Sequence, residues 1–226
     1  SGVLKITEDE EFLITLFEKN YSNYVLGAID PRFHRITSLS FWDNKMLRNK
    51  EVIHNKILIF ISHWCKMLTS LWFCETKVTD VSCLVNCKNL KRLYLKDCTG
   101  LKDISCLGQC NNLEELNLTD CMGLTDVSSL GQCKMLKDLR IINCSSVTGV
   151  SGLGQCKKLK KIIIDGNTGL TDVSGLGGCE MLNTLHIIRC TSITYVSGLS
   201  QCKKLRILYL RNCIGLTDVS DIGGYE

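Results

Sequence analysis

Apolar residues recur along most of this chain with a fixed spacing. Seven units of one shape follow each other, and the leucines that begin them are separated by 22 residues once and then by 23 residues five times. These leucines are Leu68, Leu90, Leu113, Leu136, Leu159, Leu182 and Leu205. A fixed period of this length is typical of a solenoid, in which each unit buries its apolar face by stacking on its neighbours. We therefore predict one elongated repeat array.

Each unit has two halves with different patterns. In the unit formed by residues 136–158 the first half reads L-x-x-L-x-I, which is the two-residue alternation of a short strand with one buried face. The second half reads V-x-x-V-S-x-L-x-x-C and is rich in glycine, which disfavours a long helix. Stacking should therefore align the strands in a parallel sheet, with tight turns or 3-10 segments on the opposite side.

The unit pattern L-x-x-L-x-L-x-x-(N/C)-x-(x)-L resembles the leucine-rich repeat consensus over about residues 36–226. Segments such as 121–128 (CMGLTDVS) and 213–220 (CIGLTDVS) are similar to the cysteine-containing, internalin-like subclass of these repeats, and most of all to leucine-rich repeat proteins of trypanosomes. The resemblance implies an α/β fold: a right-handed solenoid with a parallel β-sheet on its concave face, short turns or 3-10 segments on its convex face, and an N-terminal helical cap.

The two ends depart from the regular pattern. Residues 1–35 are predicted to form the helical cap, because residues 8–20 place Phe12, Leu13, Leu16 and Phe17 on one helical face. Residues 36–226 form the array, with an irregular first repeat at 36–67 and seven regular repeats at 68–226. In the irregular repeat we expect a strand near 36–41 and a longer outer helix within 46–66. Since no capping helix follows the last unit, we expect a longer array, with a covering partner or self-association through that end as the alternatives.

Composition and charge narrow the class of protein. The chain has 226 residues, of which 45% are apolar and 22% charged, and a net charge of +4. This is the profile of a folded protein, and the net charge is too small to argue for nucleic acid binding. No run of eighteen apolar residues occurs, so we expect no membrane-spanning helix.

Most of the fifteen cysteines recur at two positions of the unit. With the first leucine as position 1, position 21 holds Cys87, Cys110, Cys133, Cys156, Cys179 and Cys202, and Cys65 takes the same place before Leu68; position 9 holds Cys98, Cys121, Cys144, Cys190 and Cys213. We interpret them as reduced, buried side chains of an intracellular protein, cytoplasmic or nuclear. In leucine-rich repeats a position-9 asparagine or cysteine binds the backbone of the loop after the strand, and Asn167 takes this place once.

Two groups of potential metal ligands recur in the units, and the pattern favours a structural role for both. Cys83, Cys87, Cys106 and Cys110 lie in adjacent units and have the ligand type of a zinc site, but two of them belong to the repeated cysteine row, so neither metal nor cofactor is predicted. The aspartates of the T-D-V-S segments, and of the Lys-Asp variant at 102–105, are predicted to accept hydrogen bonds within their turns. These are Asp80, Asp103, Asp126, Asp172 and Asp218.

The resemblance implies that a partner docks on the concave sheet, through residues that the core leaves free. Position 5 gives Trp72, Tyr94, Asn117, Arg140, Ile163, His186 and Tyr209, and position 7 adds Ile142, Ile188 and Arg211. Aromatic residues and arginine dominate the energetics of protein interfaces. The alternative reading is that aromatic and β-branched residues simply suit strands.

We therefore predict a non-catalytic scaffold that binds another protein on its concave face. The first alternative is the substrate-recognition module of a ubiquitin ligase, since cysteine-bearing repeats resemble those of F-box proteins. The second is RNA binding through a row of lysines at the edge before each strand, against which Glu114, Glu115 and Glu180 interrupt the row. No catalytic motif accompanies the dispersed histidines, so no enzymatic activity is expected.

Overall fold

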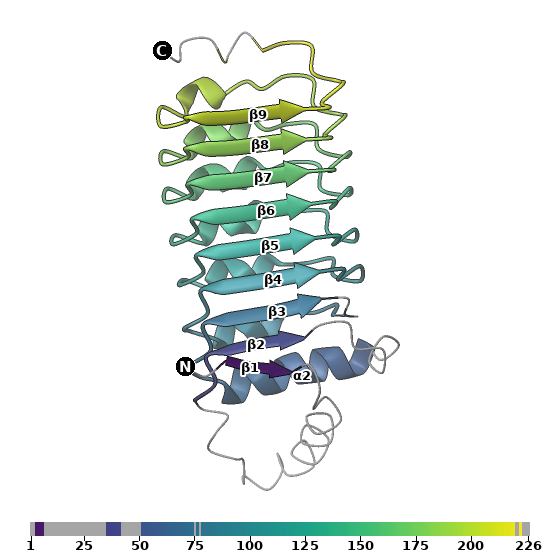
Figure 1. The fold of residues 1–226 in the computed structure, drawn as a ribbon, viewed down its shortest axis with the longest axis vertical. Coiled ribbons are helices and arrows are strands. Elements are labelled where there is room, and N and C mark those ends of the chain that lie inside the picture. Colours follow the sequence, from purple (N-terminus) through teal and green to yellow (C-terminus); the bar gives the residue numbers. More distant parts are fainter. Residues whose placement is uncertain are drawn as a thin grey trace, which may run out of the picture.

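The protein is described here from a computed structural model, which covers residues 3–6, 35–41, 51–74, 76, 78–219 and 222. Nine parallel strands form one sheet in which every strand pairs with its neighbour in sequence (Figure 1). The strands are β1 (Val3–Ile6), β2 (Ser38–Phe41), β3 (Ser70–Cys74), β4 (Arg92–Lys96), β5 (Glu115–Thr119), β6 (Asp138–Ile142), β7 (Lys161–Asp165), β8 (Thr184–Ile188) and β9 (Ile207–Arg211). The predicted leucine-rich repeat solenoid is confirmed.

Short 3-10 helices form the layer behind the sheet (Figure 1). They are η2 (Ser82–Asn86), η3 (Ser105–Gln109), η4 (Ser128–Gln132), η5 (Ser151–Gln155), η6 (Ser174–Gly178) and η7 (Leu199–Gln201). Each contains one buried leucine, such as Leu130 in η4, and each is closed by a cysteine N–H that donates to that leucine's carbonyl oxygen. The predicted 3-10 segments are therefore confirmed.

The core lies between these two layers and consists of columns that run along the stack. Leu93, Leu116 and Leu139 occupy equivalent positions of consecutive strands and are at most 1% exposed. The columns of positions 1 and 6 are buried in the same way from β3 to β8. Burial of an aliphatic side chain contributes about 1.5–3 kcal/mol, so the leucine periodicity is the main source of stability.

The first units differ from the rest. Helix α2 (Glu51–Trp64) lies within the predicted 46–66 range and replaces a 3-10 helix behind the sheet, where it contacts η2. Its residues Ile57, Leu58 and Ile61 are buried in the common core. β1 adds a strand that the sequence did not predict, paired in parallel with β2. The helix predicted over 8–20 lies outside the described residues.

Two features shape the loops between the layers. The predicted aspartate turns are present: Asp126 Oδ1 accepts from the backbone N–H of Ser128 at 2.8 Å, and Asp80, Asp103 and Asp172 accept equivalent bonds. The residue after each of β4 to β9 adopts a positive φ, which favours glycine, asparagine and aspartate. These residues are Asp97, Asp120, Asn143, Gly166, Arg189 and Asn212.

Candidate functional site

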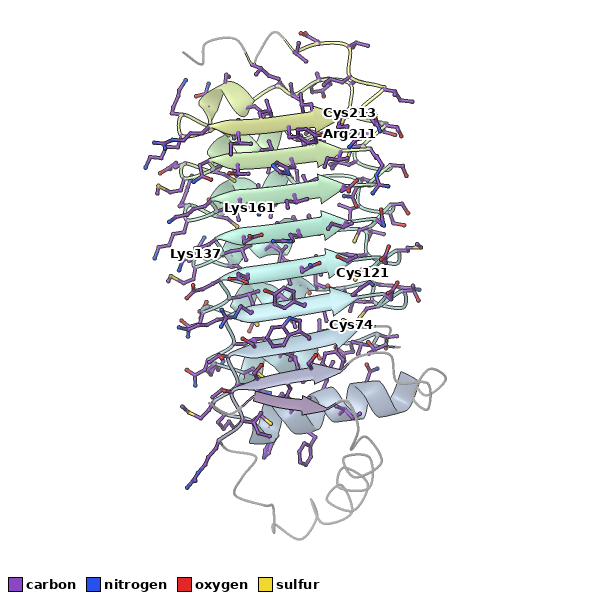
Figure 2. The ribbon with its side chains drawn as sticks, in the orientation of Figure 1. Cys74, Cys121, Lys137, Lys161, Arg211 and Cys213 are labelled. Atoms are coloured by element: carbon purple, nitrogen blue, oxygen red, sulfur yellow. The ribbon has the colours of Figure 1, made fainter. Side chains whose placement is uncertain are left out.

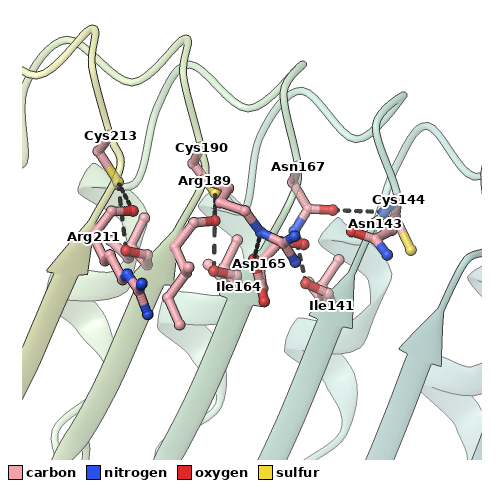
Figure 3. A network of polar contacts seen from close by, with 12 residues as sticks. Ile141, Asn143, Cys144, Ile164, Asp165, Asn167, Arg189, Cys190, Arg211 and Cys213 are labelled. Atoms are coloured by element: carbon pink, nitrogen blue, oxygen red, sulfur yellow. Dashed lines mark hydrogen bonds and ion pairs between the residues drawn. The ribbon is translucent and has the colours of Figure 1, made fainter.

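The side chain at position 9 of a unit bonds to the backbone around the loop that follows the strand, as Figure 3 shows for the C-terminal units. The side chain of Asn167 is completely buried; its Nδ2 donates to the carbonyl oxygen of Ile141 at 2.6 Å, and its Oδ1 accepts from the N–H of Cys144 at 2.8 Å. The thiol of Cys213 donates to the matching carbonyl of Ile187 at 3.4 Å. The thiols of Cys121, Cys144 and Cys190 donate to the equivalent carbonyl oxygens of Leu95, Leu118 and Ile164, so the structural role implied for position 9 is confirmed at these units.

The cysteines at position 21 form a second structural row. From Cys110 to Cys202 their thiols donate to leucine carbonyl oxygens of the preceding unit, for example Cys133 to Leu107 at 3.2 Å and Cys156 to Leu130 at 3.1 Å. All fifteen cysteines are free thiols. Within the part of the chain that the structure describes, no three His, Cys, Asp or Glu side chains gather as a metal site requires. The thiol–carbonyl bonds of this row thus join neighbouring units of the fold.

Burial makes the thiols at position 21 poor nucleophiles, and alkylation of the native protein tests this. Desolvation raises the pKa of Cys133, Cys179, Cys65 and Cys87 to about 12. Because the thiolate is the reactive form, about one thiol in ten thousand is ionised at pH 8. We expect these four cysteines to resist iodoacetamide in the native protein at pH 8 and the half-buried Cys213 to react first, as read by peptide mass spectrometry. A denatured sample labelled at all fifteen sites is the control, and native labelling of Cys133 as fast as Cys213 would contradict the assignment.

The face of the sheet that points away from the core is called the open face here, and it corresponds to the predicted concave face. Strand register joins the seven predicted position-5 residues into one unbroken row across β3 to β9. The predicted position-7 residues Ile142, Ile188 and Arg211 lie in a second row beside it, with Asp165 between the two isoleucines. All ten predicted residues thus lie on one surface. Their role in binding stays a prediction.

An aromatic pair marks the N-terminal half of the open face. The rings of Trp72 and Tyr94 stack with centroids 5.2 Å apart and planes 11° from parallel. The hydroxyl of Tyr94 donates to Glu115 Oε2 at 2.6 Å, which fixes the ring and, with desolvation as the larger cause, raises the pKa of Tyr94 to about 12. Both side chains remain half-buried. The pair therefore offers a rigid apolar platform with little conformational freedom to lose on binding.

The C-terminal half of the open face is more exposed. His186 and Tyr209 contact each other with ring centroids 5.5 Å apart. On β9, Tyr209 is 43% exposed and Ile207 is 54% exposed. Aromatic and aliphatic surface of this kind is what a protein partner typically covers. Ile207 was not predicted as a site residue, since its position 3 carries polar or charged residues in the six earlier regular units.

Ion pairs between neighbouring residues fix the polar groups of the open face. Arg140 Nε lies 3.5 Å from Asp138 Oδ1, and Arg189 Nε lies 2.8 Å from Asp165 Oδ1. The sequence did not single out Arg189; the signal for it was an arginine at position 8, which holds aspartate, asparagine or glycine after the other strands from β4 to β9. Cys74, which the repeat numbering places on this face, is only 7% exposed and thus unavailable to a large partner.

A second polar surface follows the edge where the strands begin. Figure 2 shows Lys137 and Lys161 at this edge, with Cys121 and Cys213 at the opposite one. Glu114 neutralises part of the lysine row, since its carboxylate lies 2.6 Å from Lys137 Nζ and 3.9 Å from Lys91 Nζ. Near β8 and β9 the same edge contains a pocket of about 440 Å³ lined mainly by cations.

No described helix is long and apolar enough to cross a membrane.

Comparisons with known proteins bear on the fold alone. No family model and no curated protein matches the chain. Among solved structures, internalin C2 of Listeria monocytogenes is similar over 80% of this chain and 73% of its own, with 22% identity and a TM-score of 0.56. The leucine-rich repeat domain of the type III effector XopL is similar over 83% of this chain and 64% of its own, with 17% identity and a TM-score of 0.64. A leucine-rich repeat protein of Leptospira interrogans matches over 79% and 50%, with 19% identity and a TM-score of 0.56.

Proposed function

From the leucine-rich repeat fold of this chain we infer a non-catalytic protein-interaction module that binds its partner on the open face of β3 to β9. One observation carries the proposal: the core uses every second strand residue, yet the residues on the other side form a continuous row that includes a stacked tryptophan and tyrosine. Surface aromatic residues in a preformed arrangement are the usual centres of protein interfaces. A parallel sheet of nine strands also offers a rigid surface, which suits binding without rearrangement.

The chemistry of the open face supports a protein as the partner. Along one row the aromatic residues lie toward the two ends, and polar Asn117 and Arg140 lie between them. Surfaces that combine aromatic and aliphatic side chains with a few polar groups match the composition of protein interfaces. The carboxylates of Asp138 and Asp165 are held by arginines, which supports a role in recognition over a role in acid–base catalysis.

The state of the cysteines supports an intracellular location for this module. All fifteen are free thiols and most of them are buried, and thiols of both rows, such as those of Cys133 and Cys144, donate to backbone carbonyl groups. Disulfide formation at either row would remove a thiol donor from each loop that it holds. A protein that depends on so many reduced thiols fits a reducing compartment.

The test is loss of a partner on removal of the aromatic pair. We expect Trp72→Ala with Tyr94→Ala to reduce the amount of specific partner captured from cell extract by about tenfold or more, because buried aromatic anchors contribute 2 kcal/mol or more at interfaces. Affinity purification with quantitative mass spectrometry measures the loss, followed by titration of the purified partner. Circular dichroism spectra and thermal melting check that the variant folds.

A matched control separates this effect from general loss of apolar surface. Met122 lies in the loop after β5 and is 52% exposed, so Met122→Ala removes exposed apolar area away from the open face. It should capture the partner as well as the unmodified chain. Equal capture by the Trp72/Tyr94 double variant would show that the partner does not dock on the open face.

A further inference from the structure

The edge of the solenoid near β8 and β9 carries a pocket that the proposed docking surface does not use. Its volume of about 440 Å³ lies within the range of small-molecule sites, about 300–1,000 Å³. Three consecutive units build it, because Lys160, Asn183 and Arg206 occupy the same position of their units. Backbone bonds of 2.9 Å join these residues directly, from the N–H of Asn183 to Lys160 and from that of Arg206 to Asn183.

The charges in this pocket have one sign. Lys160, Arg206, Lys203 and Lys204 line it, and no acidic residue does. Elsewhere on the same edge, acidic side chains form ion pairs with lysines: Glu114 pairs with Lys137, and Glu180 pairs with Lys157 at 3.1 Å. Within the described chain, no carboxylate lies within ion-pair distance of any of the four cations in the pocket. Four cations that converge on one concavity without a counter-charge attract an anion.

The contacts that Lys203 and Lys204 make leave their charges uncompensated. Lys203 Nζ donates to the carbonyl oxygen of Ser200 at 2.8 Å, and Lys204 Nζ lies 2.9 Å from the Sδ of Met181. A thioether is a poor acceptor for an ammonium group, and neither contact neutralises charge. An anionic oxygen adds the attraction of opposite charges to the hydrogen bond of an ammonium group, which neither a carbonyl oxygen nor a thioether supplies. Both lysines would therefore form stronger bonds by turning toward a bound anion.

The remaining groups of the pocket would orient a bound ligand. Asn183 Oδ1 accepts from Thr184 Oγ1 at 3.0 Å, so the amide nitrogen is left to donate outward. Its backbone oxygen already accepts from the N–H groups of both Arg206 and Ile207. Met181 and the nearly buried Leu205 add apolar wall. A ligand would thus be held by side chains, with one neutral donor, four cations and an apolar contact.

We propose that this pocket, the β8–β9 edge pocket, binds a compact oligophosphate carried by a small molecule. The four cations match the three to four negative charges of two or three linked phosphates, whereas a single phosphate leaves half of them uncompensated. The pocket's size fits a small molecule and not a polymer, and the acidic side chains along the edge interrupt any longer anionic track. The proposal is independent of docking on the open face.

Inorganic tripolyphosphate is the probe, and isothermal titration calorimetry of the whole chain is the measurement. We expect one binding site, with orthophosphate bound at least tenfold more weakly. The variant Lys160→Gln with Arg206→Gln should weaken tripolyphosphate binding by about tenfold or more, since two charge-assisted contacts are lost. Both residues carry exposed side chains, so folding should be unaffected, as thermal melting will verify.

A control variant that loses the same charge elsewhere on the edge distinguishes a specific anion site from general electrostatic attraction. Lys88→Gln with Lys91→Gln removes the same two charges from the same edge, outside the pocket, and should leave tripolyphosphate binding within twofold. Equal weakening by both double variants would overturn the proposal, as would absence of tripolyphosphate binding at low salt. A single-stranded ribo-oligonucleotide that binds more tightly than tripolyphosphate and responds equally to both variants would identify the edge as an RNA surface instead, against the proposal.

Discussion

Replacement of Asn167 by leucine is expected to lower the free energy of unfolding by about 2–4 kcal/mol, since a buried donor or acceptor left without a partner costs about 1–3 kcal/mol. The asparagine side chain is 0% exposed and makes three hydrogen bonds: two to the carbonyl oxygens of Ile141 and Asp165, and one from the N–H of Cys144. Leucine has the same branched arrangement of four heavy atoms in a somewhat larger side chain and offers none of these bonds. Chemical denaturation by urea, with the slope compared between variants, measures the loss.

The repeat itself supplies the matched control for this prediction. Asn167→Cys introduces the residue that holds the same position at Cys144 and Cys190, whose thiols donate to the equivalent carbonyl oxygens. A thiol restores the donor but is a weak acceptor for the N–H of Cys144. We expect a cost of about 1 kcal/mol, between the unmodified chain and the leucine variant. If the leucine and cysteine variants are equally stable, the hydrogen bonds of Asn167 do not carry the stability assigned to them.

The elements predicted correctly from the sequence are those whose pattern lies within a single repeat unit. Burial of Leu116 or Leu139 follows from the alternation within a strand, and the row of Asn167 and the cysteines follows from the recurrence of cysteine or asparagine at position 9. Strand β1 escaped prediction because four residues, VLKI, carry too short an alternation to distinguish a strand. Sheet order and layers then follow, because identical units stack in only one way.

The features that the sequence left open depend on distances between units. The lysines of the strand-start edge look alike in sequence, yet Lys137 has a carboxylate at 2.6 Å whereas Lys160 lines a pocket without one. Stacking decides this, because position 2 holds glutamate in one unit and asparagine in another. The ten predicted open-face residues were found from the repeat numbering alone, but the stacking of Trp72 on Tyr94 requires the register of their strands.

The glycines of the 3-10 layer show how closely neighbouring units approach. A Cβ atom built on Gly175 lies 2.4 Å from Cα of Ser151 in the preceding unit and 2.7 Å from its carbonyl oxygen, and both are backbone atoms that cannot rotate away. Gly152 stands in the same relation to Ser128. The equivalent position of an earlier unit holds Ser129, so comparison of repeats would suggest that a side chain is tolerated there. The structure indicates the opposite for Gly175.

We therefore expect Gly175→Ala to lower the free energy of unfolding by about 2–3 kcal/mol, because the added methyl group forces two units apart in a closely packed layer. Gly149→Ala is the matched control: nothing lies within 4 Å of its built Cβ, and loss of chain entropy in the unfolded state makes that change neutral or stabilising by up to about 1 kcal/mol. Urea denaturation of both variants measures the contrast. Equal stability of the two alanine variants would mean that the layer yields at Gly175, and that the glycines there do not set the spacing of the solenoid.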